Sequence, residues 1–585
     1  MAGSYNYKML GFFRRKFKIN EVQPPFDVRE AFSMYAEKAD SMDARQLRRF
    51  MVEFQGEPDC SELNAEGIIQ QVLQKRHHLI KFTKQHGITL DDFFFFLFST
   101  DLNGPIKTQV HHDMTAPLQQ YFIYTGHNSY LTGNQISSDC SDMPIIKALQ
   151  IGVRVIELDL WPNSARDDVN VLHGRTLTTP VALIKCLKSI KEHAFAVSPY
   201  PVVITLEDHL TPDLQAKVAK MVIETFGEML YYPDSECLEE FPSPEALKYR
   251  IILSTKPPKE YLEAKQSKDK GNISSSRRDS FEEEPPENET SDVCDSESDE
   301  EDSDVYVLDG DSCHLGAPEY KRLIAIHAGK PKNGLREALH IGIEKVRRLS
   351  LSEQALEKAA RNYGTDVVRF TQRNILRIYP KGTRIRSSNY KPMVAWMHGA
   401  QMVAFNMQGY GKSLWLMNGM FRSNGGCGYV KKPDFLLVKG PNNEAFDPKV
   451  PLPVKKILKV RVYMGDGWGH DFSKTHFDTY SPPDFYTKLY IVGVPADCAK
   501  NKTKIIEDDW APVWDQEFSF PLTVPELALL QIIVGEHDTS EKDDFGGQTC
   551  LPVLDIKPGI RAIPLFNRKG EKFPSVKLLV RFQFV

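Results

Sequence analysis

Polar residues follow a series of short apolar runs, and their types could do chemistry together. In chain order they are His127, Asn128, Glu157, Asp159, His173, Glu207, Lys256, Arg377 and Tyr379. The amide and the three carboxylates offer four oxygen ligands and no thiolate, a set that suits Ca²⁺ or Mg²⁺ better than zinc. Two histidines then remain for proton transfer or charge stabilisation. These residue types predict a metal-assisted hydrolase or phosphotransferase with a basic subsite.

The elements that must position these residues are short strands alternating with helical segments from residue 121 onward. The expected strands are FIYTGHN, VRVIELDLW, VNVLHG, VVITLEDH, RIILSTK, NILRIYP and QMVAFNMQ. Segments with helical periodicity, such as LQAKVAKMVIETFGEML, lie between them. This alternation favours a (β/α)₈ barrel over an open sheet, and barrel strands all end at one rim. A single strand-end carboxylate is usually a solvated loop residue or a helix cap, but their coincidence at one rim favours a functional site.

The rest of the chain predicts further domains, because 585 residues exceed what one hydrophobic core supports. Helical spacing of Leu47, Phe50 and Met51 predicts a small helical lobe near the N-terminus. Short strands separated by Pro, Gly and Asp predict an antiparallel β-sandwich at the C-terminus. We expect a helical domain at 1–105, a first barrel half at 106–258, a linker at 259–318, a second barrel half at 319–437 and the sandwich at 438–585.

The linker has an unusual charge. Asp279–Asp304 contains 14 acidic and no basic residues, so a chain of net charge −5 carries +9 outside this stretch. Such a segment cannot bury enough apolar surface to fold, and we expect it to be disordered. It either competes with an anionic partner for the basic barrel rim or serves as a passive spacer. The basic remainder suggests a membrane or nucleic acid as that partner, but no nucleic-acid-binding motif is present.

Targeting signals and cysteine patterns point to the cytosol. The first 20 residues lack an apolar signal-peptide core and the usual myristoylation pattern, and no apolar run approaches the length of a spanning helix. Nine cysteines lie scattered without a CxxC pair, which fits reduced thiols. We therefore expect a cytoplasmic protein.

Several uncommon motifs resemble the X and Y halves of the eukaryotic phosphoinositide-specific phospholipases C. They are GHNSYL (126–131), ELDLW (157–161), LHGRTLTT (172–179), LEDH (206–209), RIYP (377–380), SSNYKP (387–392) and NGGCGYVKKP (424–433). They occur in family order on both sides of the acidic linker. Without a pleckstrin-homology domain before the helical lobe, the arrangement is similar to the plant form of the enzyme.

The resemblance implies a Ca²⁺-dependent reaction. Phosphatidylinositol 4,5-bisphosphate would be attacked by its own inositol 2-hydroxyl, giving diacylglycerol and a cyclic phosphodiester that water opens to inositol 1,4,5-trisphosphate. By analogy, His127 supports the phosphorane, His173 protonates the leaving oxygen and later activates water, and Glu157 accepts the 2-hydroxyl proton. The implied Ca²⁺ ligands are Asn128, Glu157, Asp159 and Glu207.

The resemblance also implies a substrate subsite formed by Lys256, Ser352, Arg377 and Tyr379. There is one departure from the animal enzymes, which have a second lysine where this chain has Ser254. Loss of a cation should weaken the preference for the doubly phosphorylated headgroup, so phosphatidylinositol 4-phosphate is an alternative substrate.

The terminal sandwich resembles a C2 domain, whose loops collect carboxylates for Ca²⁺ and dock on anionic lipid. The implied ligands are Asp484, Glu536, Asp538 and Asp544. The N-terminal lobe resembles an EF-hand-type lobe, but EKADSMDARQL lacks the ligand spacing of a Ca²⁺ loop, so we expect a scaffold. FRRKFK (13–18) combines basic and aromatic residues as a lipid-adsorbing segment does, or is a solvated end.

These features predict a signalling enzyme, expected as a monomer at the inner face of the plasma membrane. A non-catalytic calcium-regulated membrane adaptor with the same fold is the main alternative. It is disfavoured because both histidines and all four implied metal ligands are present.

Overall fold

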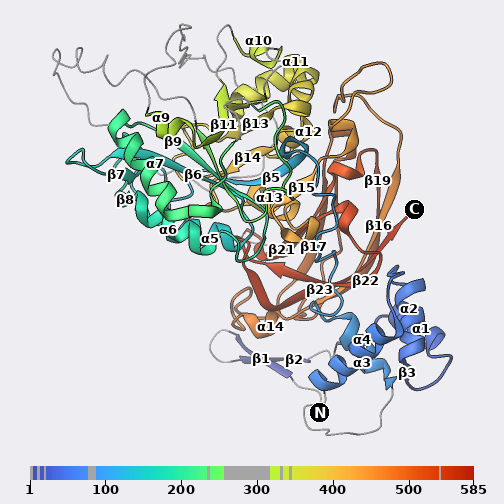
Figure 1. The fold of residues 1–585 in the computed structure, drawn as a ribbon. Helices are drawn as coiled ribbons and strands as arrows, with labels where there is room; N and C mark the ends of the chain where they lie inside the picture. Colours follow the sequence, from blue (N-terminus) through green and yellow to red (C-terminus); the bar gives the residue numbers. More distant parts are fainter. Residues whose placement is uncertain are drawn as a thin grey trace.

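The computed structural model describes residues 4–9, 13–18, 22–76, 87–233, 238–255, 317–329, 334–340, 346–538 and 542–585. Three bodies follow one another along the chain, a blue helical lobe, a barrel and an orange-to-red sandwich (Figure 1). The predicted linker at 259–318 lies outside the described residues except for its last two positions, and Lys256 lies outside them as well. The domain boundaries remain predictions.

The barrel is closed by eight parallel strands in the described part of the chain. They are β5 (Tyr121–Gly126), β6 (Val155–Pro162), β9 (Val202–Asp208), β10 (Ile251–Thr255), β11 (Ile324–Gly329), β12 (Arg348–Ser352), β13 (Ile375–Tyr379) and β14 (Met402–Phe405). Each pairs in parallel with the next, and β14 returns to β5. The predicted (β/α)₈ barrel is therefore confirmed.

One predicted barrel strand is wrong. VNVLHG contains β7 (Val169–Val171), which pairs antiparallel with β6 and then with β8 (Val181–Ala182). The connection from β6 to β7 spans only residues 163–168. A parallel crossover needs a dozen or more residues, so this short connection can only turn back. The third barrel strand is β9, and β11 and β12 were not predicted.

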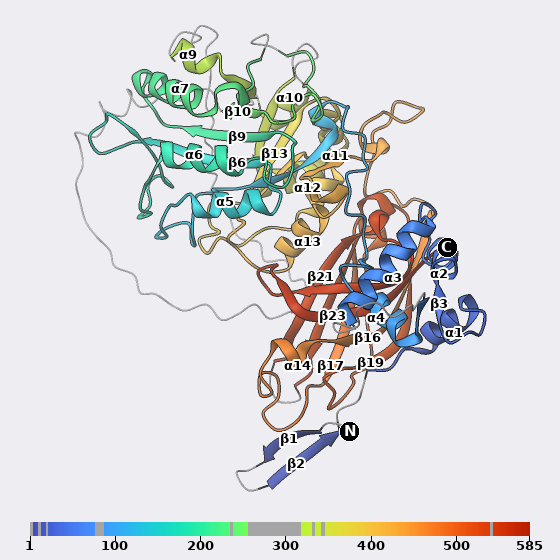
Figure 2. The same cartoon turned by 60° about the horizontal axis from the view of Figure 1, so that its bottom comes forward.

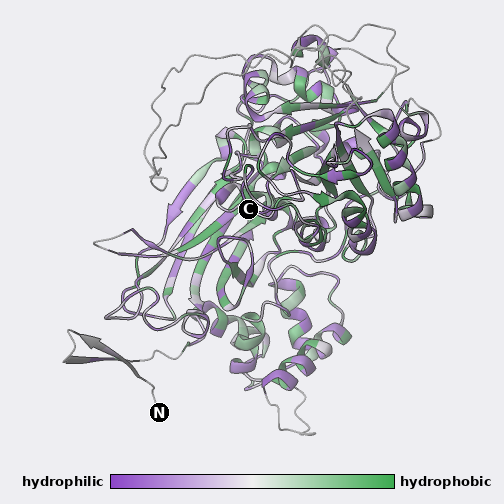
Figure 3. Ribbon diagram, turned by 90° about the vertical axis from the view of Figure 1, so that its left-hand side faces the viewer, coloured by the Kyte–Doolittle hydropathy of each residue, from purple (hydrophilic) through white to green (hydrophobic). Residues whose placement is uncertain are grey.

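Helices cover the outside of the barrel. They include α5 (Met143–Gln150), α6 (Leu183–His193), α7 (Pro212–Phe226), α9 (Pro318–Lys321), α10 (Leu335–His340), α11 (Glu353–Arg373), α12 (Met393–Met397) and α13 (Lys412–Met420). Hydrophobic colour is concentrated in the barrel strands, whereas the outer helices mix hydrophobic and hydrophilic residues (Figure 3). Strands covered on both faces are expected to be continuously apolar, and β5 and β10 are buried throughout. A short strand, β15 (Tyr429–Lys431), pairs antiparallel with β5.

The C-terminal domain is an antiparallel sheet of eight strands within the described residues. They are β16 (Lys456–Asp466), β17 (Phe485–Val492), β18 (Ala499–Lys502), β19 (Val513–Leu522), β20 (Leu529–Glu536), β21 (Asp544–Pro552), β22 (Gly559–Phe566) and β23 (Lys572–Phe584). Its two four-stranded halves touch through one residue pair, Gln548 and Phe566, and enclose Trp468 and Trp514. The predicted sandwich is confirmed. Arg422, two residues after the end of α13, links it to the barrel by donating to Thr549 Oγ1 at 2.8 Å.

The N-terminal lobe has the helices α1 (Phe26–Tyr35), α2 (Ala44–Glu53), α3 (Glu62–Arg76) and α4 (Leu90–Leu97) in its described part. β3 (Met42–Asp43) pairs with β4 (Gly87–Ile88), so two helix–loop–helix units join through their loops, as expected for an EF-hand-like lobe. Asp43 and Thr89 each form a capping box, which explains where α2 and α4 begin. The lobe lies against the sandwich (Figure 2), where buried Arg561 donates to Asn103 at 3.0 Å.

Candidate active site

The strand ends bring three carboxylates together. Asp159 on β6 lies opposite Glu207 on β9, and Glu157 lies opposite Thr205 in the same parallel register. One oxygen from each of Glu157, Asp159 and Glu207 lies within 4.8 Å of the others. A set made of oxygen donors fits a hard divalent cation, so these residues could hold a metal ion.

Asn128 lies beside this carboxylate cluster. Its backbone N–H donates to Glu157 Oε2 at 3.2 Å, and its φ of 42° is in the left-handed region that Asn tolerates. Its amide nitrogen donates to Gln135 Oε1 at 3.0 Å. Oδ1 is therefore the atom that Asn128 can offer to a cation, and all four predicted metal ligands are adjacent in the structure.

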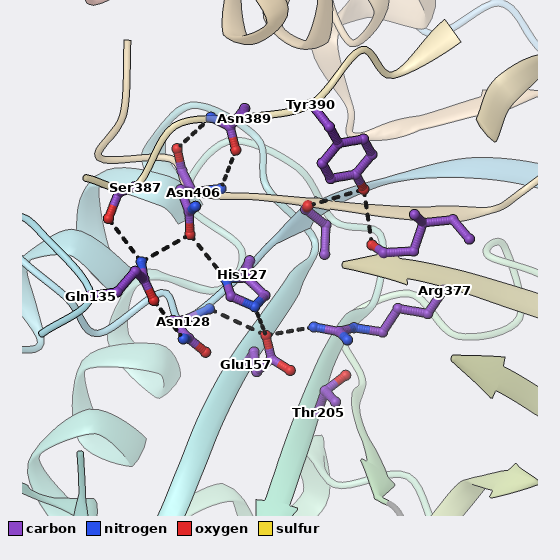
Figure 4. A network of polar contacts seen from close by, with 12 residues as sticks. His127, Asn128, Gln135, Glu157, Thr205, Arg377, Ser387, Asn389, Tyr390 and Asn406 are labelled. Carbon is purple, nitrogen blue, oxygen red and sulfur yellow. Dashed lines mark hydrogen bonds and ion pairs between the residues drawn. The ribbon is translucent and has the colours of Figure 1, made fainter. Parts of the chain in front are cut away.

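Glu157 forms a buried ion pair with Arg377 of β13. Nη2 of Arg377 lies 2.5 Å from Oε2 of Glu157, and the Arg377 side chain is 4% exposed (Figure 4). Burial alone would raise the pKa of Glu157, but the Arg377 guanidinium and the His127 ring outweigh it and hold that pKa below its usual value. Arg377 was predicted to contact substrate, and here its guanidinium contacts this carboxylate.

His127 is held by a chain of amides. Its Nδ1 lies 2.9 Å from Asn406 Oδ1, which also accepts from Gln135 Nε2 at 3.2 Å, while Asn406 Nδ2 donates to Ser388 O. Because Asn406 presents an acceptor, Nδ1 of His127 carries the hydrogen and Nε2 is left for chemistry. Nε2 lies 4.0 Å from Glu157 Oε2 (Figure 4). Burial lowers the pKa of His127, although Glu157 acts in the opposite direction.

His173 follows β7 rather than a barrel strand, but it reaches the same rim. Its Nδ1 lies 2.6 Å from the backbone oxygen of Gln135. A carbonyl oxygen can only accept, so Nδ1 donates and Nε2 is again the free nitrogen. Both predicted histidines therefore have the same tautomer, fixed by neighbours on the far side of each ring.

Gln135 is a residue that the sequence interpretation missed. Its backbone oxygen holds His173, its side chain bonds Asn128 and Asn406, and its Nε2 also donates to Ser387 Oγ at 2.8 Å. The side chain is buried (Figure 4). The available signal was indirect, because Ser387 belongs to the SSNYKP motif.

The described substrate-subsite candidates lie at the ends of neighbouring strands. Ser352 ends β12, caps α11 by accepting from Ala355 N–H at 3.2 Å, and lies opposite Tyr379 at the end of β13. The guanidinium of Arg377 lies 5.7 Å from the Tyr379 ring centroid. These three residues share the rim with the carboxylate cluster. Lys256 follows β10 directly but lies outside the described residues.

A second guanidinium lies inside the barrel. Arg348, the first residue of β12, is buried and donates to Ser254 Oγ at 2.7 Å and to Thr205 Oγ1 at 3.2 Å. Burial, reinforced by the nearby Arg377, lowers the pKa of Arg348 to about 9. Ser254, noted for lacking a lysine's charge, is thus hydrogen-bonded to a cation from another strand. Sequence reasoning missed Arg348 because a basic residue at a strand start is unremarkable.

Apolar side chains lie at the rim beside His173. Leu177 is 79% exposed, Ile385 48% and Ile136 39%. They belong to adjoining loops, because Leu177 N–H donates to Ile136 O and Gln135 N–H donates to Ile385 O. Exposed apolar residues that gather next to a polar site indicate a surface that contacts lipid or protein.

The sandwich loops hold a second carboxylate cluster. One oxygen from each of Glu536, Asp538 and Asp544 lies within 4.8 Å of the others, and Asp484 N–H donates to Glu536 Oε1 at 3.3 Å. Burial, together with Asp478 and Asp538, raises the pKa of Glu536 to about 8. Asp478 was not predicted. Crowded carboxylates of this kind favour a bound cation.

Comparison with known proteins assigns these sites to a family. The phosphatidylinositol-specific phospholipase C X-domain model matches residues 114–257, the Y-domain model 333–435 and the C2 model 456–565. The chain is 62% identical over 607 residues to phosphoinositide phospholipase C 6 of Arabidopsis thaliana, covering 100% of this chain and 98% of that relative. The chain belongs to the phosphoinositide-specific phospholipase C family. The predicted plant-type arrangement and enzymatic class are confirmed.

More distant relatives share the same organisation. A mouse 1-phosphatidylinositol 4,5-bisphosphate phosphodiesterase delta-3 is 33% identical over 98% of this phospholipase and 69% of its own length. The crystal structures of S. officinalis PLC21 and L. pealei PLC21 align over 96% of this chain and 68% and 69% of theirs. Their TM-scores are 0.70 and 0.71 at 24% and 23% identity, which supports the fold alone.

Proposed function

We propose that this phospholipase C hydrolyses phosphatidylinositol 4,5-bisphosphate in a Ca²⁺-dependent reaction, giving diacylglycerol and inositol 1,4,5-trisphosphate through a cyclic phosphodiester. The observation that carries the proposal is the common orientation of His127 and His173. Each ring donates its Nδ1 hydrogen to a fixed oxygen, and this leaves Nε2 for substrate at the rim that holds the carboxylate cluster. Two such nitrogens beside an oxygen-donor cluster match a phosphodiester cleaved in two steps.

The residues divide the proton transfers between them. Asn128 and the three carboxylates would hold Ca²⁺, and the bound ion would supply a Lewis acid that lowers the pKa of the inositol 2-hydroxyl and offsets charge on the phosphoryl oxygens. Glu157, kept ionised by Arg377, accepts the 2-hydroxyl proton. His127, protonated at both ring nitrogens for this step, donates its Nε2 hydrogen to the phosphorus-bound oxygen on which negative charge develops. His173 enters the reaction as an imidazolium, with Nδ1–H held by the Gln135 carbonyl oxygen, and gives its Nε2 proton to the departing diacylglycerol oxygen; the deprotonated Nε2 then accepts a proton from the water that opens the ring.

A singly phosphorylated lipid is the alternative substrate. Ser254 Oγ accepts from Arg348 and donates to the backbone oxygen of Ile326 at 2.9 Å, so it is committed within the barrel wall. Ser254 therefore offers no positive charge to a second ring phosphate, whereas Lys256 is the cation proposed to bind one ring phosphate. This supports activity on phosphatidylinositol 4-phosphate as well as on the bisphosphate.

The membrane is the proposed location of the substrate. The apolar side chains around His173 and the carboxylate cluster of the C2 loops support reversible docking on an anionic bilayer, with Ca²⁺ held by Asp484, Glu536, Asp538 and Asp544. Among the described residues, none of the helices has the length and apolar character needed to cross a bilayer. We place the enzyme at the inner face of the plasma membrane as a monomeric peripheral protein.

The test is a Ca²⁺ titration of hydrolysis on vesicles that carry either phosphoinositide. His127→Gln and His173→Gln should each lower turnover by roughly 10²–10⁴-fold with vesicle binding retained, because a positioned acid or base contributes about that much. His193→Gln, at the end of α6, is the matched control and should hydrolyse normally. Near-normal turnover in either rim variant would remove that histidine from the mechanism, and hydrolysis that persists in chelator would reject the metal.

A further inference from the structure

The N-terminal hairpin is docked on the sandwich although it precedes the helical lobe in sequence. β1 (Ser4–Met9) and β2 (Phe13–Lys18) pair antiparallel and lie near the end of the sandwich that carries α14 (Trp468–Asp471) (Figures 1 and 2). Trp510 Nε1 donates to the Tyr7 hydroxyl at 3.0 Å. The Tyr7 and Phe17 rings meet edge to face at 5.5 Å and are 3% and 9% exposed.

This end of the sandwich is where the acidic loops meet. The segments 467–484 and 503–512 connect strands at this end, and the described residues 537–538 and 542–543, which follow β20 and precede β21, lie at the same end. These segments carry or border the C2 carboxylate cluster. Arg15 Nη2 lies 3.7 Å from Asp508 Oδ2, and Asp508 N–H donates to Asp484 Oδ1 at 2.8 Å. The hairpin therefore contacts the loop next to Asp484, one of the predicted C2 ligands.

The hairpin is strongly cationic. Residues 1–20 contain five basic and no acidic residues. In the hairpin register Tyr7 lies opposite Arg15, and Asn6 lies opposite Lys16, which is exposed. The exposed pair between Arg15 and Asp508 is a weak restraint, since both side chains are more than a third exposed.

We propose that the paired strands β1 and β2 are a second membrane-contact element at the loop end of the C2 domain, and that their partner is the anionic surface of a lipid bilayer. Aromatic residues that anchor a basic strand beside lipid-docking loops suit a bilayer surface, where basic side chains gain from negative lipid. When no cation is bound, the pair between Arg15 and Asp508 holds the hairpin weakly at the acidic loops. Neutralisation of those loops leaves the cationic strand free to face the bilayer. The inference rests on the proposed membrane docking and adds an element that the reaction itself does not need.

The experiment uses the full-length protein and vesicles of phosphatidylcholine with or without phosphatidylserine, which contain no substrate. The variant Arg14→Ser/Lys16→Ser/Lys18→Ser removes three of the five basic residues of positions 1–20. Binding to the phosphatidylserine vesicles should weaken by roughly 100-fold at low salt, since each cation near such a surface contributes about fivefold. The loss should shrink as salt is added.

The matched control removes three exposed lysines from α6 and α7. Lys188→Ser/Lys191→Ser/Lys220→Ser has the same change in net charge and should bind nearly as the parent does. If both triple variants lost the same vesicle affinity, the loss would come from overall net charge, and the proposal would be overturned. Vesicle binding by the hairpin variant as tight as that of the parent would overturn it as well. Hydrolysis of a soluble inositol phosphodiester should be unchanged in the hairpin variant. Slower soluble hydrolysis by the hairpin variant together with normal vesicle binding would also overturn the proposal. If instead the proposed reaction is wrong, the parent protein itself would show no hydrolysis.

Discussion

Asn406→Leu separates the orientation of His127 from its chemistry. In the folded protein Asn406 Oδ1 accepts the Nδ1 hydrogen of His127 at 2.9 Å and is 1% exposed. Leucine keeps a similar volume but offers no acceptor, and the His127 side chain is only 16% exposed, so water replaces the lost partner poorly. A buried donor left without a partner costs about 1–3 kcal/mol. At about 1.4 kcal/mol per factor of ten, turnover should fall by roughly 5- to 150-fold.

The assay compares kcat and KM for a soluble inositol phosphodiester, which removes membrane docking from the measurement. We expect kcat to fall with KM little changed, because Asn406 acts through His127 and not on the ground-state substrate. Asn406→Asp should retain most of the activity, since a carboxylate accepts the same hydrogen. Asn103→Leu is the matched control. Asn103 is equally buried and donates to Leu97 O and Ile560 O, so its loss should lower stability and spare kcat.

The reasoning would be refuted by a parental kcat in a well-folded Asn406→Leu protein. That result would mean that the Nδ1 contact does not select the working orientation of His127. An equal loss of kcat in the Asn103→Leu control would instead trace the effect to general destabilisation.

Three further predictions concern a buried lysine beside α11, the barrel wall and the C2 loops. Burial lowers the pKa of Lys432 to about 7, so between pH 7 and 10 the unfolded chain binds a proton that the native state lacks. The free energy of unfolding should therefore rise by about 1.4 kcal/mol per pH unit over this range. Lys432→Met should remove this contribution to the pH dependence of the free energy of unfolding. Ser254→Lys places a second cation against Arg348 and should lower the melting temperature. The double variant Ser254→Lys/Arg348→Met should regain much of the lost melting temperature. A double variant no more stable than Ser254→Lys would contradict the charge argument. Asp538→Asn should weaken Ca²⁺-dependent vesicle binding by on the order of tenfold and spare soluble hydrolysis, so equal losses in both assays would mean that the two carboxylate clusters are not independent.

The sequence alone determined which residues form the carboxylate cluster. An apolar run predicts a strand, parallel strands end at one rim, and a polar residue at the end of such a run must therefore face that rim. Glu157, Asp159 and Glu207 needed no further information, and the structure places their oxygens within 4.8 Å of one another. The fold class followed from the same alternation of strands and helices. Local pattern was sufficient here because both conclusions depend on chain direction and periodicity.

Local pattern could not separate a barrel strand from a hairpin strand. VNVLHG has the same composition in either role, and only the short return from β6 makes β7 antiparallel. His173 lies at the rim as predicted, but it follows the antiparallel strand β7 and not a barrel strand.

Tertiary structure alone decided which groups orient the site. Asn406 lies 279 positions from His127, Ser387 lies 252 from Gln135, and Trp510 lies 503 from Tyr7. Arg348 looks like an ordinary basic residue until closure of the barrel buries it against Ser254. Hydrogen bonds and ion pairs depend on distances of a few ångströms. For residues this far apart in the chain, those distances are set by how the strands, loops and domains pack.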